Sequence, residues 1–181
     1  MASELIVQTI KGPTSGANAN KVIVPAGQTL DASSGAVTGI DGVILQILSV
    51  EENTSTTITS SSHTNTAVTL SITPSATSSK ILVLGSIQVM SYKNGSPGSS
   101  DGYYRIRNTT NSTQSTSYYI QNHDYGGSGT IQDASRSMQW LDTPNSTSSQ
   151  TYVIQMRKTS GDAIVSNNGG YSSLTLMEIA G

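Results

Sequence analysis

The stretch AVTLSI, residues 67–72, places valine, leucine and isoleucine at every second position, with threonine and serine between them. A period of two is typical of a β-strand with one buried and one exposed face. Pro74 follows two positions later, and proline is rarely found inside a central strand. This stretch therefore predicts a short strand that ends before a turn, in a chain built from strands of the same kind.

Similar short segments recur on both sides of this stretch, separated by residues that favour turns. Further strands are predicted at residues 43–50, 54–60, 80–90, 103–108, 116–121, 137–141, 151–157 and 174–179. A bulge or a close backbone approach is expected near Gly85, and loops are expected at residues 94–98 and 126–129. Eight or nine strands at this spacing, without a helical period, predict an all-β jelly-roll sandwich of about eight strands.

The composition excludes several functional classes. Hydrophobic residues make up 34% of the chain and charged residues 11%, but the net charge of -2 is too small for typical disorder. The chain has no cysteine, which excludes disulfides and thiolate metal sites. Nine lysines and arginines and a pI near 5.5 argue against a nucleic-acid-binding protein.

Neither a membrane span nor a secretion signal is predicted. The apolar run at residues 43–48 is far too short to cross a bilayer. The first residues, MASELIV, lack the basic and long apolar regions of a signal peptide. We therefore expect no membrane insertion, and synthesis in a cytoplasm.

The N-terminal stretch KVIVPAGQTLDASSG, residues 21–35, is extended and interrupted by proline and glycine. Its strand candidates, like those at residues 4–10, are short and have no partner of similar length nearby, and isolated hairpins are marginal in water. We therefore expect an extended anchoring arm at residues 1–42, lying against another subunit or protein, and a sandwich domain at residues 43–181.

Three segments resemble marine bacteriophage tail-fibre and virion structural proteins of the cyanophage and pelagiphage type. They are the arm at residues 21–35, the stretch SITPSATSSKIL at residues 71–82 and the ending SSLTLMEI at residues 172–179. The last two look like the start and end of the jelly roll of those proteins, which is similar to the trimeric tumour-necrosis-factor class. The resemblance implies a homotrimer in the virion whose residues 1–42 bind other virion proteins of the tail or capsid.

Candidate catalytic and metal-ligating residues are few. His123 and Asp124 are adjacent, but no nucleophile elbow accompanies them. Four aspartates are scattered between different predicted strands, namely Asp101, Asp124, Asp133 and Asp142. We interpret His123 and Asp124 as part of a polar loop and do not expect the aspartates to converge, so we expect no catalytic residues, no metal site and no cofactor.

The tyrosines form the most informative group of side chains. Tyr103-Tyr104 and Tyr118-Tyr119 are adjacent pairs inside predicted strands, so one member of each pair must point inward and the other outward. An outward tyrosine suits a subunit interface or a sugar. We expect Tyr103, Tyr119 and Trp140 in the trimer interface, with glycan binding by the outward tyrosines as the alternative.

Two segments, residues 91–101 and 121–133, are predicted to be long polar loops. Loops on a rigid sandwich commonly carry recognition residues. If these two cluster at the end away from the arm, we expect Asn122, Asp124 and Tyr125 to contact a host glycan or protein. The alternative is that the loops only fill the distal cap of the trimer.

Three functions follow, in order of preference. The first is a trimeric tail-fibre or appendage protein that attaches to the particle by its arm and displays the jelly roll for host contact. The second is a capsid decoration trimer, a cement protein or head fibre, that stabilises the shell. The third is a glycan-degrading enzyme, which is disfavoured because no convergent pair of carboxylates can be named.

Overall fold

The computed structural model describes residues 14–16, 42–93, 98–124, 130–167 and 169–181. The chain divides into two units, Met1–Gly39 and Ile40–Gly181, and all ten described strands lie in the second unit. The strand candidates at residues 4–10, 21–24 and 28–32 lie outside the described residues. The anchoring arm and its boundary at residue 42 therefore stay predictions.

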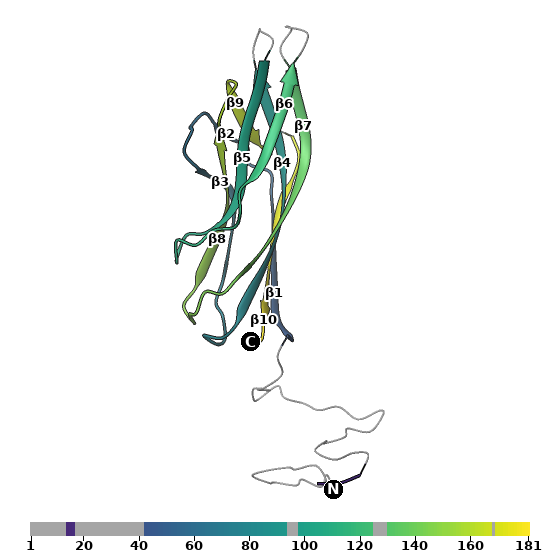
Figure 1. The fold of residues 1–181 in the computed structure, drawn as a ribbon, viewed down its shortest axis with the longest axis vertical. Coiled ribbons are helices and arrows are strands. Elements are labelled where there is room, and N and C mark those ends of the chain that lie inside the picture. The colour runs from purple at the N-terminus through teal and green to yellow at the C-terminus, as the bar shows by residue number, and fades with distance from the viewer. Residues whose placement is uncertain (1–13, 17–41, 94–97, 125–129, 168) are drawn as a thin grey trace. The chain divides into compact units, whose positions relative to one another are not determined.

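Two antiparallel sheets form a sandwich in the second unit (Figure 1). The strands are β1 (Ile44–Glu52), β2 (Thr56–Ile58), β3 (Thr64–Ile72), β4 (Lys80–Lys93), β5 (Gly98–Asn108), β6 (Tyr118–Asp124), β7 (Thr130–Asp142), β8 (Gln150–Lys158), β9 (Ala163–Ser166) and β10 (Ser172–Ile179). The described residues contain no helix, and hence none that could cross a membrane. The all-β prediction is confirmed.

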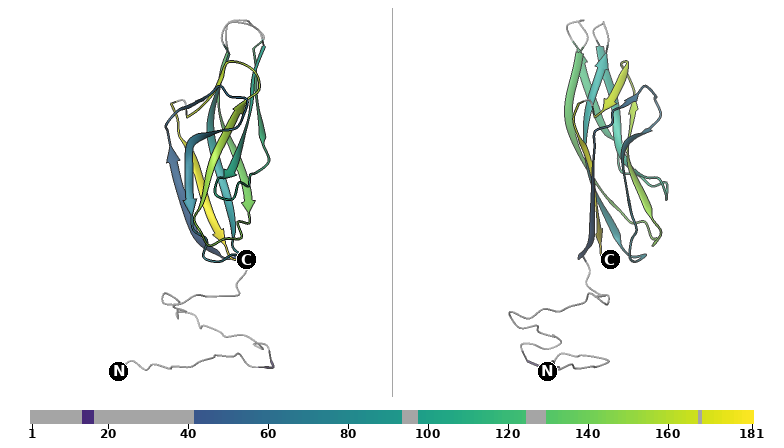
Figure 2. Two further views of the ribbon diagram at one scale, coloured as in Figure 1. Left: turned by 90° about the vertical axis from the view of Figure 1, so that its left-hand side faces the viewer. Right: turned by 180° about the vertical axis from the view of Figure 1, so that it is seen from behind.

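The number of strands corrects the prediction of about eight. Ten are described, because the short strand β9, which was not predicted, pairs with β2 and β4 in one sheet. That sheet, sheet A, has the order β1-β10-β4-β9-β2, and β7 pairs along the other edge of β4. Sheet B has the order β3-β8-β5-β6. Figure 2 shows the two layers from other sides.

With β2 and β9 set aside, sheet A reads β1-β10-β4-β7 and sheet B reads β3-β8-β5-β6. In each sheet an early strand thus pairs with a late one, β1 with β10 and β3 with β8. This order is consistent with the predicted jelly-roll winding, in which two Greek keys wrap around one core.

The core lies between the sheets and consists of the inward residues of alternating strands. In β10 the exposed fraction of Leu174 and Leu176 is 0%, whereas the residues between them are half-buried. β10 lies between β1 and β4, so the prediction of an inner strand with a buried Leu176 is confirmed.

Gly85 marks a close approach and not a bulge. The pairing of β4 with β10 and β7 runs without a register shift through Gly85, which lies opposite Leu174 and Met138. A Cβ atom at Gly85 would lie 3.0 Å from the Cγ atom of Met138. The glycine therefore leaves room for a neighbouring side chain inside the sandwich.

The two predicted polar loops, residues 91–101 and 121–133, consist largely of strand. β4 continues to Lys93 and β5 begins at Gly98, while β6 ends at Asp124 and β7 begins at Thr130. Glycine and polar residues suggested loops, but pairing with neighbouring strands supplies the backbone hydrogen bonds that hold them extended. Local sequence could not reveal this pairing.

The ends of these four strands cluster, because Gly98 pairs with Asp124 and Lys93 pairs with Thr130. At the opposite end of the sandwich, the backbone N–H of Gly42 donates to the carbonyl of Ala180 at 2.9 Å. The described sandwich therefore begins beside its C-terminus, and the β4–β5 and β6–β7 strand ends lie at the far end (Figure 1).

A buried carboxylate joins the two sandwich segments on which the virion resemblance rests. Glu178 of β10 is completely buried, and its Oε1 atom accepts hydrogen bonds from the Oγ atoms of Ser75 at 2.6 Å and Ser79 at 2.7 Å. The Nε2 group of Gln46 donates to Oε2. Burial raises the pKa of Glu178, but these hydrogen bonds lower it more, so the net pKa lies below its usual value.

Candidate functional site

The tyrosine pairs lie directly opposite each other in sheet B, because Tyr103 pairs with Tyr119 and Tyr104 with Tyr118. Tyr104 and Tyr118 point inward, with ring centroids 5.3 Å apart and stacked planes. Tyr103 and Tyr119 lie on the outer face, with centroids 5.1 Å apart. The prediction of one inward and one outward tyrosine in each pair is confirmed.

Three arginines share this outer face. Arg157 of β8 is the cross-strand partner of Tyr103, and its guanidinium carbon lies 4.5 Å from the centre of the Tyr103 ring. Arg105 and Arg107 follow Tyr103 at steps of two along β5, and successive steps of two keep side chains on one face. Two adjacent strands thus bring together three positive charges and an aromatic pair.

Neutral amide groups hold two of these guanidinium groups in place. The Nε group of Arg105 donates to the Oε1 atom of Gln155 at 2.9 Å, and Gln155 in turn donates to Asn65 at 2.8 Å. An Nη1 group of Arg107 donates to the Oε1 atom of Gln114 at 3.1 Å. These amides orient the guanidinium groups without neutralising their charge.

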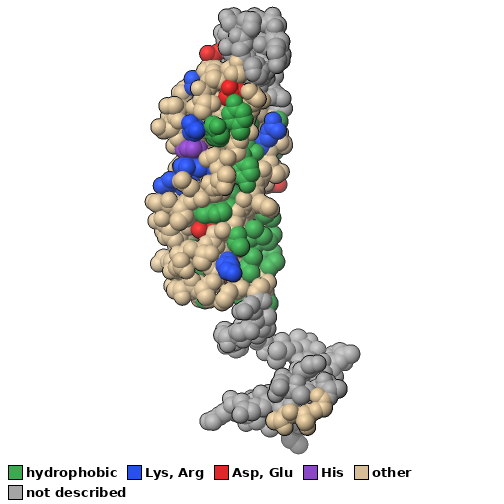
Figure 3. Space-filling model, in the orientation of Figure 1, with side chains coloured by type: hydrophobic (Ala, Val, Ile, Leu, Met, Phe, Trp, Pro, Cys, Tyr) green, Lys and Arg blue, Asp and Glu red, His purple; other side chains and the backbone are tan. Residues whose placement is uncertain are grey.

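A shallow polar hollow of about 770 Å³ lies over the arginines. His63, just before β3, lines it together with the three arginines, Asn65 and Gln155. Burial, followed by the charges of Arg105, Arg157 and Arg107, lowers the pKa of His63 to about 4. Figure 3 shows basic side chains gathered around a histidine on one side of the molecule.

The same charges act on Arg105. Partial burial, with Arg107 and Arg157 nearby, lowers the pKa of the Arg105 guanidinium from its usual value. Arginine remains protonated at neutral pH even so. The hollow is therefore a positive site in which His63 is neutral at pH 7.

The outer face of sheet A has a different chemistry. Register places Ile47, Met177, Leu82 and Leu141 in one row across β1, β10, β4 and β7. Ile47 and Leu141, at the two ends of this apolar row, are 54% and 52% exposed. Directly opposite side chains in antiparallel strands lie on the same face, so the row forms one apolar band.

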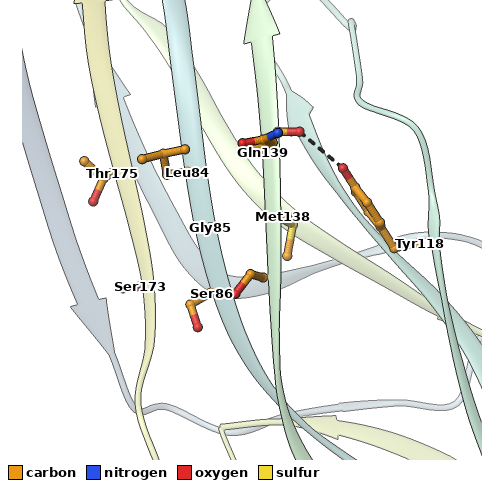
Figure 4. A pocket seen from close by; sticks show the side chains of 9 residues that line it. Leu84, Gly85, Ser86, Tyr118, Met138, Gln139, Ser173 and Thr175 are labelled. Carbon is orange, nitrogen blue, oxygen red and sulfur yellow. Dashed lines mark hydrogen bonds between the residues drawn. The ribbon is translucent and has the colours of Figure 1, made fainter.

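A second hollow, of about 490 Å³, lies beside the apolar row. Figure 4 shows Leu84 and Ser86 of β4, Ser173 and Thr175 of β10, and Met138 of β7 around it. The hydroxyl group of Tyr118 donates to the backbone carbonyl of Gln139 at 3.3 Å on its margin. Small hydroxyl side chains thus leave a depression next to the large apolar ones.

The predicted receptor residues are only partly described. Asn122 and Asp124 lie in the last part of β6, as does His123, but their side chains and the whole of Tyr125 lie outside the described residues. Asn122 pairs with Ser100 and Asp124 with Gly98, which places this backbone at the far end of sheet B. Their role in receptor contact stays a prediction.

Trp140 is half-buried and packs against the core. The centroid of its ring lies 6.0 Å from that of the Tyr152 ring, in an edge-on arrangement. An interface role for Trp140, as for Tyr103 and Tyr119, stays a prediction.

Two of the four aspartates considered above, Asp101 and Asp142, have described side chains, and both are acceptors in hydrogen-bond networks. Asp101 accepts from the hydroxyls of Ser99 and Ser160, each at 2.7 Å. Asp142 accepts from Asn108 at 3.0 Å and from the Tyr152 hydroxyl at 2.8 Å. Within the described part of the chain, no group of three or more histidine, aspartate or glutamate side chains could hold a metal ion.

Sequence reasoning missed the arginine site. The alternation of Tyr103, Arg105 and Arg107 in one strand was visible, but Arg157 joins them only through the pairing of β5 with β8. His63, which stands among serines and threonines in the sequence, precedes β3 and is half-buried beside the arginines.

No protein-family model matches the chain, and no curated protein matches it. Among solved structures, the chain is similar to a chain of the infectious bursal disease virus particle, with 13% identity and a TM-score of 0.34 over 87% of this chain and 40% of that one. The Gx strain of the same virus gives 13% identity and a TM-score of 0.32, over 86% of this chain and 43% of that one.

The VP2 subviral particle of that virus gives 15% identity and a TM-score of 0.30, over 93% of this chain and 45% of that one. The chain thus spans less than half the length of each of these viral chains. At such TM-scores the likeness adds nothing to the sandwich that the strand pairing already defines.

Proposed function

We propose that this chain is a virion structural protein, the subunit of a trimeric tail-fibre or appendage that attaches to the particle through residues 1–42 and displays its sandwich for host contact. The observation that carries the proposal is the apolar row on the outer face of sheet A. Its end residues, Ile47 and Leu141, are more than half exposed in the single chain. Contiguous apolar surface of this kind marks an interaction site.

A second copy of the chain is the partner that this face fits best. Lys80 is the one charged outward residue next to the row on β4, so copies packed there would bring fewer like charges together than copies packed on sheet B. The apolar row stands beside the hydroxyl-lined hollow, which gives one face both a protrusion and a depression. β1 is also an edge strand, whose free backbone groups a subunit contact would cover.

The outer face of sheet B is less suited to the trimer contact. Tyr103 and Tyr119 lie there, but Arg105, Arg107 and Arg157 lie on the same face. Three copies meeting on that face would bring like charges together. We therefore place the trimer contact on sheet A, and leave sheet B facing outward.

The direction of the sandwich supports anchoring through the preceding residues. Gly42 and Val43 hydrogen-bond with Ala180, so the sandwich begins at one end, and the β4–β5 and β6–β7 strand ends lie at the other. An anchor at residues 1–42 would leave the far end for host contact. Capsid decoration is the second candidate, since it uses the same trimer and arm on the shell.

Immunogold electron microscopy of intact particles tests the location. We expect label on the tail or an appendage, and loss of label from particles that carry the chain without residues 1–40. Label over the capsid shell would favour decoration. Particles without label, or normal incorporation of the truncated chain, would contradict the proposal.

A further inference from the structure

Subunit packing on sheet A does not account for the arginine hollow of sheet B. Arg105 and Arg107 rest on neutral amides, and Arg157 rests on the face of the Tyr103 ring. Arg105 and Arg157 are diagonal neighbours on adjacent strands, because Arg105 pairs with Gln155 and Arg157 pairs with Tyr103 two positions away. Their mutual repulsion is relieved when an anion enters the hollow.

The described groups define what kind of anion fits. Guanidinium groups bind carboxylate, sulfate and phosphate through two parallel hydrogen bonds. Tyr119 is 49% exposed beside Tyr103, which adds a flat aromatic surface with a hydroxyl tip. A hollow of about 770 Å³ is far larger than one inorganic ion and has the size of sites for organic ligands.

We propose that the hollow lined by Arg105, Arg107 and Arg157 binds an acidic saccharide, a sugar chain that carries carboxylate or sulfate groups. The arginines hold its anionic groups, and the Tyr103–Tyr119 pair contacts a sugar ring. Three positive charges on a chain of net charge -2 form a short site and not the basic stripe that nucleic acid requires.

This inference rests on the proposed function, because it names the class of host surface molecule that an appendage would contact. It also moves the contact from the β6–β7 end of the sandwich to the flat face of sheet B. The test of saccharide binding uses the purified full chain. The test of the location in the virion uses microscopy of particles, so a failure of one claim is distinguishable from a failure of the other.

Isothermal titration calorimetry provides the test, with four probes of similar length. Oligogalacturonate supplies carboxylates, a dextran sulfate oligosaccharide supplies sulfates, neutral dextran supplies sugar without charge, and a single-stranded oligonucleotide supplies phosphates. We expect binding of at least one acidic saccharide and none of neutral dextran. The probe that binds identifies the anionic group.

The variants are Arg105→Gln, Arg157→Gln and Arg107→Lys, with Lys80→Gln as the matched control. Lys80 is exposed on β4 of sheet A, and its substitution removes one positive charge outside the hollow. Losing a charge-assisted hydrogen bond should weaken binding about 10- to 100-fold in each glutamine variant. Arg107→Lys keeps the charge but loses the planar fork, and should weaken binding less.

Three results would overturn the inference. They are the absence of binding to either acidic saccharide, equal binding by Arg105→Gln, Arg157→Gln and Lys80→Gln, and tighter binding of the oligonucleotide than of both saccharides. Thermal melting of every variant shows whether the fold is kept. If one glutamine variant does not fold, the other and Arg107→Lys still decide the question.

Discussion

On the outer face of sheet A, one row across four strands reads Ile47, Met177, Leu82 and Leu141, whereas on sheet B the row across three strands reads Arg157, Tyr103 and Tyr119. Both rows belong to the same sandwich and lie over the same core. The first contributes apolar surface without charge, and the second sets a guanidinium group against an aromatic pair. One framework can therefore carry two separate recognition surfaces.

The largest expected effect separates the core from the outer face of sheet A. Leu176 and Met177 are neighbours in β10 that point to opposite sides. Leu176→Ala should lower the free energy of unfolding by about 2–5 kcal/mol, because it leaves a cavity in the core. Met177→Ala should cost about 0.5 kcal/mol or less in dilute protein.

Urea denaturation of both variants checks this pair. Equal losses of stability would mean that the row on sheet A is part of the core and not a free surface.

The next effect concerns the buried carboxylate of Glu178, which joins residues 71–82 to residues 172–179. Glu178→Gln should cost about 1.5–3 kcal/mol, because hydrogen bonds to a charged group are replaced by weaker ones. Glu51→Gln, on the exposed end of β1, is the matched control and should cost little.

The pH dependence has a definite sign. The folded pKa of Glu178 lies below the usual 4.5, so its stabilisation is present above that pH and is lost as the pH falls through the folded pKa. Melting temperatures measured from pH 6 to pH 3 should fall more steeply for the wild type than for Glu178→Gln. Parallel curves would contradict this assignment.

The smallest expected effect is a change in the pKa of His63, which reports on the positive charge of the arginine hollow. His63 has a pKa of about 4 in the folded chain, so an unfolded chain binds the proton more readily between pH 6.5 and 4, and stability should fall as the pH drops through that window. Arg105→Gln should raise the pKa of His63, because it removes a nearby positive charge.

Nuclear magnetic resonance titration of the His63 ring protons measures this shift, with Lys80→Gln as the control. An unchanged pKa in Arg105→Gln would show that the arginine does not act on the histidine.

The sequence was sufficient for features set by local alternation. The strand at residues 174–179, the buried Leu176 and the orientation of both tyrosine pairs all follow from a period of two. Strands rich in serine and glycine were less predictable. The segments around Ser91 and Asp101 resemble loops in composition and become strands only through pairing.

Features set by distant contacts could not be predicted. Glu178 meets Ser75 and Ser79 across about a hundred residues of chain, and Arg105 meets Gln155 across fifty. No local pattern shows which strands become neighbours. The candidate site therefore appeared only when the strand order was known, although each of its residue types was visible beforehand.

The most direct test of the account is the oligomeric state measured by sedimentation velocity at micromolar concentration. We predict that the wild type is a trimer, that the double variant Ile47→Asp and Leu141→Asp is a folded monomer, and that Tyr119→Ala remains a trimer. A wild-type monomer would contradict the assignment of the apolar row on sheet A to subunit contact. So would a Tyr119→Ala variant that dissociates while the Ile47→Asp and Leu141→Asp double variant remains a trimer.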